Sequence, residues 1–300
     1  MSLYVGIDGG GTKTTGVIGD ADHVLATATA GPSNVIRVGE AQARQALVSV
    51  IGDLCSSARI SPVHITRTCI GLAGAAHPNV RDWAQRTVKD LTSGDFVIVG
   101  DMEIALESAF EGGPGMIVIA GTGSIAYARD GQGNTHRVGG WGYAISDEGS
   151  GHWIGREAVR AALRAEDIEP GGSQLISGLL AAWNLSDRAD LIRRGNAVPP
   201  PEFSSLLSVV IESADKEDAV ARDVLCAAGC ELARMAAIAL RKLPPTVPTR
   251  VAISGGVFRH SSVVRDVFYN ELRSICPSAE FVPGVCDPVH GALWLARNAK

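Results

Sequence analysis

The segment 6–14, with the sequence GIDGGGTKT, gathers residue types that bind phosphate. Apolar runs on either side of it, 3–5 and 17–18, predict a β-hairpin whose turn holds an anion. Glycine leaves backbone N–H groups open to a phosphate, threonine donates a hydroxyl hydrogen bond, and lysine adds positive charge. The residues expected to bind phosphate here are Gly9, Gly10, Gly11, Thr12 and Lys13, with Thr14 as a further hydroxyl donor.

Asp8 directly precedes these glycines. A carboxylate aimed at a phosphate would repel it, so we expect a divalent cation, or water bound to one, between the two groups. The segment fits neither common nucleotide fingerprint. Position 14 is Thr where the dinucleotide pattern needs Gly, and Thr12 precedes Lys13 where the P-loop needs Gly. A glycine-rich turn without any ligand is the alternative.

A similar pattern opens the second half of the chain, where an apolar run over 116–120 leads into a turn and a return strand over 125–128. The residues of this turn are Gly121, Thr122, Gly123 and Ser124. The repetition indicates an internal duplication, in which two hairpins grip a polyphosphate from both sides. A third glycine turn, with Gly255 and Gly256, follows an expected strand over 250–253 and suits contact with a nucleoside.

Asp101 follows an expected strand over 96–99. The first hundred residues read as three antiparallel strands and then alternating helices and strands, which predicts a parallel extension of an antiparallel sheet. Functional groups collect at the carboxyl ends of such strands. Asp101 is therefore a candidate general base. The alternative is that it caps the helix expected over 104–110.

The segment 138–151, VGGWGYAISDEGSG, is too rich in glycine for regular structure and too aromatic for a linker, so we expect an ordered binding loop. Its glycines let the backbone approach a ligand, its tryptophan offers an apolar face to a sugar ring, and an aspartate accepts hydroxyl hydrogen bonds. The residues expected to contact sugar here are Gly140, Trp141, Gly142 and Asp147.

Asn34 ends the loop 31–34, and its amide can both donate to and accept from a sugar. A turn residue bonded to its own backbone is the alternative. An amphipathic helix is expected over 39–59. Its apolar face consists of Ala43, Ala46, Leu47, Val50, Ile51 and Leu54.

Helical spacing continues farther along the chain. The helices expected there cover 79–91, 152–165, 173–183, a segment that contains 203–210, 216–242, 261–273 and 289–299. The closing helix carries Gly291 and Ala292, and this small face should pack back on the first domain. Gly112–Gly115 punctuates the chain and marks the expected domain junction.

The chain has 300 residues, 46% hydrophobic and 20% charged, with a net charge of −5 and a pI near 5.8. Scattered Lys and Arg residues argue against a nucleic-acid surface, and no run is apolar enough to span a bilayer. A cytoplasmic location and small-molecule chemistry are therefore expected. The six cysteines contain no C-x-x-C pair, which suits reduced, buried thiols. Cys226 and Cys230, one helical turn apart, are expected to pack in a core, with metal binding as the alternative.

The three glycine turns, with Asp101 between the first two, resemble the phosphate, phosphate and adenosine motifs of the sugar kinase, actin and heat-shock ATPase superfamily. GGWG and DEGS within 139–150, with Asn34 upstream, look like the N-acetylglucosamine kinase branch. The resemblance implies an α/β fold with two actin-like (ribonuclease H-like) domains, each a mixed sheet flanked by helices, around a nucleotide cleft. The domains would be 1–112 with 288–300, and 113–287 with a helical insertion.

The resemblance also implies roles. Asp8 would organise Mg²⁺, the glycine turns would bind ATP, and Asp101 would accept the proton of the sugar's 6-hydroxyl. The sugar pocket would contain Asn34, Asp101, Ser124, Gly140, Trp141, Gly142 and Asp147. The partners would be an amino sugar, ATP and a second copy of the chain in a homodimer, with neither nucleic acid nor membrane.

Two rival functions follow from the same resemblance, and a non-catalytic sugar sensor is a further alternative. A glucosamine kinase would differ only in the pocket around C2. An activator ATPase of the 2-hydroxyacyl-CoA dehydratase type would need cluster-binding cysteines, and no cysteine here lies in a glycine-flanked pattern near the junction. A non-catalytic sugar sensor would have no need for both Asp8 and Asp101.

Overall fold

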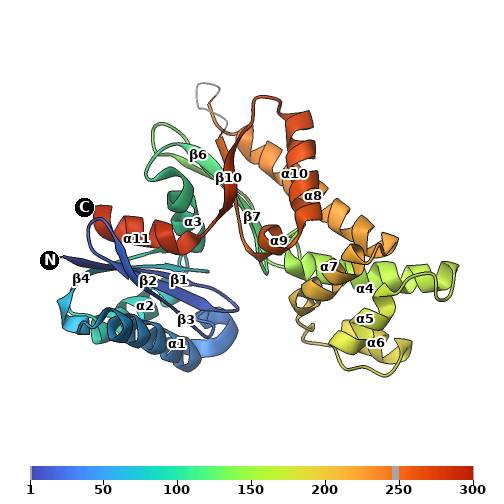
Figure 1. The fold of residues 1–300 in the computed structure, drawn as a ribbon, viewed down its shortest axis with the longest axis horizontal. Helices are drawn as coiled ribbons and strands as arrows, with labels where there is room; N and C mark the ends of the chain where they lie inside the picture. Colours follow the sequence, from blue (N-terminus) through green and yellow to red (C-terminus); the bar gives the residue numbers. More distant parts are fainter. Residues whose placement is uncertain (1, 245–249, 300) are drawn as a thin grey trace. The chain divides into compact units, whose positions relative to one another are not determined.

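The computed structural model describes residues 2–244 and 250–299. They form two compact units, Met1–Ile117 with Cys286–Lys300 (unit 1) and Val118–Val285 (unit 2). Each unit is built on a five-stranded sheet flanked by helices, which confirms the predicted fold class (Figure 1). None of the helices among residues 2–244 and 250–299 has an apolar stretch that could span a bilayer.

The sheet of unit 1 has the strand order β3-β2-β1-β4-β5. Its strands are β1 (Leu3–Gly9), β2 (Thr14–Gly19), β3 (Val24–Ala30), β4 (Ile65–Leu72) and β5 (Asp95–Gly100). The first three strands pair antiparallel, and β1, β4 and β5 run parallel. The antiparallel sheet with a parallel extension, predicted from the alternation of elements, is confirmed.

Helices cover both faces of this sheet (Figure 1). They are α1 (Val35–Ala58), α2 (Pro78–Leu91), α3 (Asp101–Phe110) and α11 (Pro288–Asn298), and a 3₁₀ turn covers Pro62–His64. The α1 and α2 helices share one core with the sheet, and α3 and α11 share another. The predicted apolar face of α1, from Ala43 to Leu54, is buried as expected. The helix starts at Val35 rather than at 39, but Gly39 interrupts it with φ 79° and ψ 164°.

Two glycines explain how α11 reaches the centre of unit 1. A Cβ on Gly291 would overlap the carbonyl oxygen of Ile104 in α3, and one on Gly6 would overlap the backbone of Leu293. Only glycine at both positions lets the helix lie against α3 and β1 this closely. The predicted packing of the small face of the closing helix on the first domain is therefore confirmed.

The sheet of unit 2 has the order β10-β9-β6-β7-β8. Its strands are β6 (Gly115–Ala120), β7 (Ser124–Arg129), β8 (Thr135–Gly139), β9 (Arg250–Ser254) and β10 (Glu280–Cys286). The sequence interpretation missed β10. It was also wrong to exclude regular structure at Val138 and Gly139, because both pair with β7 as the last residues of β8.

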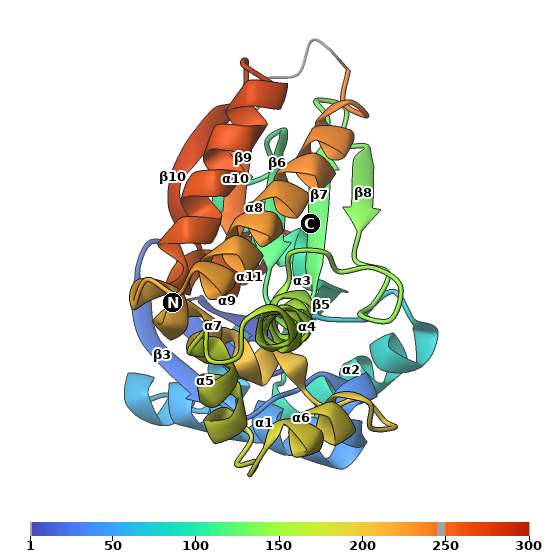
Figure 2. The same cartoon turned by 90° about the vertical axis from the view of Figure 1, so that its right-hand side faces the viewer.

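Helices account for the rest of unit 2. They are α4 (Gly151–Ile168), α5 (Leu175–Ala182), α6 (Arg188–Gly195), α7 (Leu207–Asp215), α8 (Ala219–Leu240), α9 (Gly256–His260) and α10 (Ser262–Ile275), with a 3₁₀ turn at Phe203–Leu206. The α8 and α10 helices lie side by side, and α8 packs on β7 and β8 (Figure 2). The predicted helical insertion corresponds to the run from α4 to α8, of which α6 had not been predicted.

Candidate functional site

Two of the predicted carboxylates lie at one edge of the unit 1 sheet. Because β1, β4 and β5 are parallel, their carboxyl ends meet at the same edge. Gly9 and Gly100 both pair with Leu72 of the intervening strand, so Asp8 and Asp101 stand at the ends of two strands that are about 10 Å apart. The topology therefore brings together the predicted metal ligand and the predicted base.

The first glycine turn, 9–13, is fixed by its backbone. The Gly10 N–H donates to the Lys13 carbonyl at 3.0 Å, and the Gly10 carbonyl accepts from the N–H groups of Ser33 and Asn34 at 3.2 Å each. These bonds tie the turn to the entry of α1. Thr12 and Lys13 remain exposed, as a ligand-binding role requires.

Thr14 does not share that exposure, and its proposed contact with phosphate is wrong. Its side chain is fully buried, and its hydroxyl donates to the Gly31 carbonyl at 2.7 Å and lies 2.8 Å from the Ser33 hydroxyl. Strand alternation turns Thr14 away from the exposed Lys13 and into the support of the turn.

Asn34 caps α1. Its Oδ1 accepts the N–H of Arg37 at 3.3 Å, so the local-bonding alternative describes its oxygen correctly. Its Nδ2 lies 4.0 Å from the position that a Cβ on Gly11 would take. The same Gly11 position is 3.4 Å from an Arg37 guanidinium nitrogen, a neighbour that the sequence interpretation had not considered.

Asp101 is the first residue of α3, and Gly100 is its N-cap residue. The Asp101 carboxylate accepts the N–H of Met102 at 3.0 Å, while Glu103 accepts the N–H of Gly100. Gly100 and Glu103 thus form the N-terminal cap of α3 without the Asp101 side chain. A carboxylate at the start of a helix also interacts favourably with the helix dipole.

The second glycine turn, 121–124, is fixed in a comparable way. The Gly121 N–H donates to the Gly123 carbonyl at 2.9 Å, and the Gly121 carbonyl accepts from the N–H of Gly151 at 2.8 Å. The buried hydroxyl of Ser124 donates to the Glu148 carbonyl at 2.7 Å. The turn is therefore bonded to the binding loop and to the start of α4.

Asp147 lies beneath this turn, 8% exposed and with a left-handed φ of 68°. Burial raises the pKa of its carboxyl group, against the hydrogen bonds it accepts from the N–H groups of Gly142 and Ser124. A carboxylate offers about four acceptor positions, so these two bonds leave capacity for a hydroxyl. The structure thus gives Asp147 a supporting role that the sequence interpretation had missed.

Trp141 is 63% exposed in the loop that follows β8. The guanidinium of Arg137 lies over its ring, 4.3 Å from the centroid, and also donates to the carbonyls of Gly139 and Gly140. Arg137 therefore fixes the Trp141 ring relative to the backbone of Gly139 and Gly140. The ring of Tyr143 in the same loop packs against that of His152, with the centroids 4.8 Å apart and the rings tilted by 36°.

The third glycine turn lies beside the second. Gly255 has φ 102°, and a Cβ there would overlap the carbonyl group of Ala120, directly before Gly121. Glycine is thus required at 255 both for its conformation and for close approach. Gly256 then begins α9.

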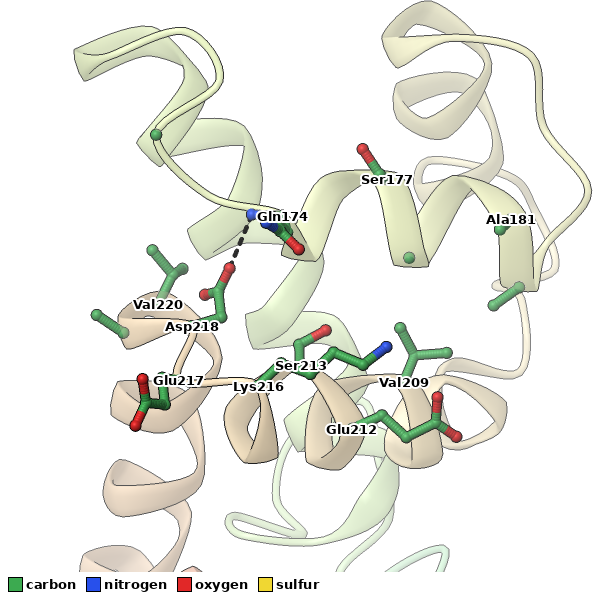
Figure 3. A pocket seen from close by; sticks show the side chains of 14 residues that line it. Gln174, Ser177, Ala181, Val209, Glu212, Ser213, Lys216, Glu217, Asp218 and Val220 are labelled. Carbon is green, nitrogen blue, oxygen red and sulfur yellow. Dashed lines mark hydrogen bonds between the residues drawn. The ribbon is translucent and has the colours of Figure 1, made fainter.

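A cavity of about 790 Å³ lies elsewhere in unit 2, between α5, α7 and the start of α8 (Figure 3). None of the predicted site residues lines it. Asp218 at its end accepts from the backbone N–H of Gln174 at 2.8 Å and caps α8, so its charge is used in joining helices. We assign this cavity no part in the chemistry.

One group of three possible metal ligands occurs within the described residues, namely Asp20, Asp22 and His23 between β2 and β3. Asp20 accepts the N–H groups of Asp22 and His23 at 2.8 and 2.7 Å. This is the ordinary bonding of an aspartate-initiated turn.

The chain is similar over nearly its whole length to known sugar kinases, in sequence and in structure. An N-acetylmuramic acid/N-acetylglucosamine kinase of Clostridium acetobutylicum is 32% identical, covering 99% of both chains. An N-acetyl-D-glucosamine kinase of Dictyostelium discoideum is 28% identical, covering 99% of this chain and 98% of the other. The crystal structure of a candidate N-acetylglucosamine kinase of Chromobacterium violaceum superposes with a TM-score of 0.79 at 28% identity, covering 99% of both chains. A family profile matches residues 5–296, and the chain belongs to the BadF/BadG/BcrA/BcrD ATPase family.

Proposed function

We propose that this protein transfers the γ-phosphoryl group of ATP to the 6-hydroxyl of N-acetylglucosamine. The structural observation that carries the reaction type is the placement of Asp101 at the same sheet edge as Asp8 and the first glycine turn. The full-length similarity to kinases named for N-acetylglucosamine supports the sugar.

In this proposal Asp101 accepts the proton of the 6-hydroxyl as that oxygen attacks the γ-phosphorus. The new O–P bond forms while the bond from the γ-phosphorus to the β–γ bridging oxygen breaks, and ADP leaves. Phosphoryl transfer requires alignment, charge neutralisation and a base, but no covalent nucleophile. The proposed phosphate contacts are Gly9, Gly10, Gly11, Thr12, Lys13, Gly121, Thr122 and Gly123, with Gly255 and Gly256 at the nucleoside.

Asp8 is the residue proposed to hold Mg²⁺. It fits the ion because Mg²⁺ binds through one or two carboxylates together with substrate phosphates, and Asp8 is a half-buried carboxylate directly before a glycine turn. When bound, Mg²⁺ neutralises phosphate charge.

The proposed sugar contacts are Asn34, Asp101, Ser124, Gly140, Trp141, Gly142 and Asp147. Trp141 offers ring surface to a pyranose, because it is well exposed while Arg137 holds it in place. The preference for an acetamido group rests on the relatives and on the sequence of the binding loop, which offers no carboxylate beyond Asp147 and Glu148 for a free amine.

An ADP-release assay with the full chain tests the proposal on N-acetylglucosamine, glucosamine, N-acetylmannosamine and glucose. We expect N-acetylglucosamine to be best, with glucosamine and glucose poorer by about tenfold or more, because an unmatched buried polar group is costly. Phosphorus NMR of the product checks that the phosphate is on the 6-oxygen. A clear preference for glucosamine would instead indicate a glucosamine kinase, and ADP release indifferent to every sugar would favour an activator ATPase.

A further inference from the structure

His152, the second residue of α4, contacts both parts of the candidate site that unit 2 contributes. Its backbone N–H donates to the Thr122 carbonyl of the second glycine turn at 3.3 Å. Its imidazole ring packs against the ring of Tyr143 in the binding loop, with the centroids 4.8 Å apart. One residue therefore touches the turn proposed to bind phosphate and the loop proposed to bind sugar.

The imidazole ring is itself fixed in place, since His152 is only 9% exposed. Phe203 of the 3₁₀ turn also packs against it, with the centroids 5.2 Å apart and the rings at 75°. Gly155 lets this turn approach α4, because a Cβ there would overlap the Phe203 carbonyl oxygen. Burial lowers the pKa of His152, the Arg156 guanidinium lowers it further, and Glu202 acts against both. The binding loop thus packs on a rigid ring that is uncharged at neutral pH.

Tyr143 belongs to a compact turn over 142–146. The Gly142 carbonyl accepts the N–H groups of Ile145 and Ser146 at 3.1 and 2.9 Å. Because these bonds close the turn on itself, a shift of Tyr143 would move Gly142 and the adjoining Trp141 with it. Both of these neighbours are proposed sugar contacts.

We infer that His152 is a positioning residue for the sugar, whose ring holds Tyr143 and thereby keeps the sugar contacts of the binding loop in place beside the second glycine turn. This inference rests on the proposed function. The ring acts by packing rather than by proton transfer, because it is buried against the aromatic rings of Tyr143 and Phe203. An aromatic ring without nitrogen should therefore replace it.

The test compares His152→Ala with His152→Phe in the full chain. The alanine variant loses the ring but keeps the backbone N–H that bonds to Thr122. Its KM for N-acetylglucosamine should therefore rise by about five- to tenfold, the scale of one aromatic pair, while its KM for ATP stays within about twofold of the wild type. The phenylalanine variant should keep both KM values within about twofold. Calorimetry with N-acetylglucosamine alone should rank the binding affinities in the same order.

Tyr143→Ala removes the same contact from its exposed side. It should raise the KM for the sugar by a similar factor, and adding His152→Ala should cause little further change, because the contact is already lost. Tyr269→Ala is the matched control. Tyr269 of α10 packs on Phe281 of β10 at 4.7 Å, so this variant loses an aromatic pair elsewhere in the unit and should keep both KM values.

Three outcomes would overturn the inference. One is an unchanged KM and affinity for the sugar in His152→Ala and Tyr143→Ala. Another is a His152→Phe variant as impaired as His152→Ala, which would assign the role to the imidazole nitrogens. The third is an equal rise in the KM for ATP and for the sugar, which would indicate general damage. If the wild type phosphorylates no sugar, the proposed function fails, and the calorimetric comparison alone decides whether His152 positions the loop.

Discussion

The two glycine turns, 9–13 in unit 1 and 121–124 in unit 2, are held by the same device. In each, a carbonyl oxygen accepts backbone N–H groups from the start of a later helix. The Gly10 carbonyl accepts from Ser33 and Asn34 before α1, and the Gly121 carbonyl accepts from Gly151 at the start of α4. Backbone hydrogen bonds therefore fix each turn before any ligand arrives, and buried side chains, Thr14 at the first turn and Ser124 and Asp147 at the second, add support. Two different sequences reach this result because the bonds are made by the backbone.

The surroundings of the turns differ in charge. The first turn has Lys13 exposed within it and Arg37 above it, while the second packs on the buried carboxylate of Asp147 and the buried hydroxyl of Ser124. Cations beside the first turn suit charge neutralisation, and the second turn is suited to rigid positioning. The predictions below test this division.

The largest effect is expected at Asp101, because a positioned base contributes about 10²-fold or more to turnover. Asp101→Asn should therefore lower kcat by at least ~10²-fold and leave nucleotide binding intact. Asp95→Asn, at the start of the preceding strand β5, is the control, since it removes an exposed contact with Arg67 at 3.7 Å. Near-normal turnover of Asp101→Asn would show that Asp101 is not the base and only provides a favourable charge at the start of α3.

Asp8→Asn should raise the Mg²⁺ concentration needed for half-maximal activity by about tenfold, because Mg²⁺ binds carboxylates in preference to amides. The measurement is a Mg²⁺ titration of turnover at saturating sugar. Asp22→Asn, in the group of possible ligands between β2 and β3, should leave the titration unchanged. The role of Asp8 is lost if its variant titrates like the wild type.

Adding one methyl group to each turn compares how tightly the turns are packed. A Cβ on Gly123 would lie 2.8 Å from Asp147 Oδ2, while one on Gly11 would lie 3.4 Å from the end of the flexible Arg37 side chain and 4.0 Å from Asn34 Nδ2. Urea unfolding should show that Gly123→Ala costs about 1–2 kcal/mol and Gly11→Ala less than about 0.5 kcal/mol. If both substitutions lowered the free energy of unfolding equally, the second turn would not be the more tightly packed one.

The smallest effect concerns pH. Because burial raises the pKa of Asp147, its contribution to stability is full below the ordinary value of 3.8 and is lost as pH rises through the raised pKa. Measured by urea unfolding, the free energy of unfolding of the wild type relative to Asp147→Asn should therefore increase as pH falls through this window. If this difference in the free energy of unfolding did not change with pH, it would argue against a buried, destabilised Asp147 carboxylate.

Asp218, in the same unit, should make the free energy of unfolding depend on pH in the opposite direction. Burial opposes its ionisation, but hydrogen bonds from the Ala221 N–H, the Ser173 hydroxyl and further N–H groups outweigh it and lower its pKa. Its contribution is present above 3.8 and is lost as pH falls through the lowered pKa. Relative to Asp218→Asn, the wild type should thus lose stability on acidification.

Local patterns in the sequence predicted much of the fold. The first hairpin, the buried face of α1 and the glycine contact of α11 follow from alternation, helical spacing and residue size, which act over a few neighbouring residues. The order of motifs also predicted the family. The domain boundaries at 112/113 and 287/288, and the homodimer, stay predictions.

Tertiary structure decided what lies around those motifs. Thr14 is a support rather than a ligand because Gly31 and Ser33 return beside it, and β10 forms because it pairs with β9 at the edge of a sheet begun far earlier in the chain. Arg37 over Gly11 and Asp147 beneath the second turn are contacts between residues far apart in the sequence, made by residues of ordinary type. No local pattern marks them, because each acquires its role only from a partner that folding brings to it.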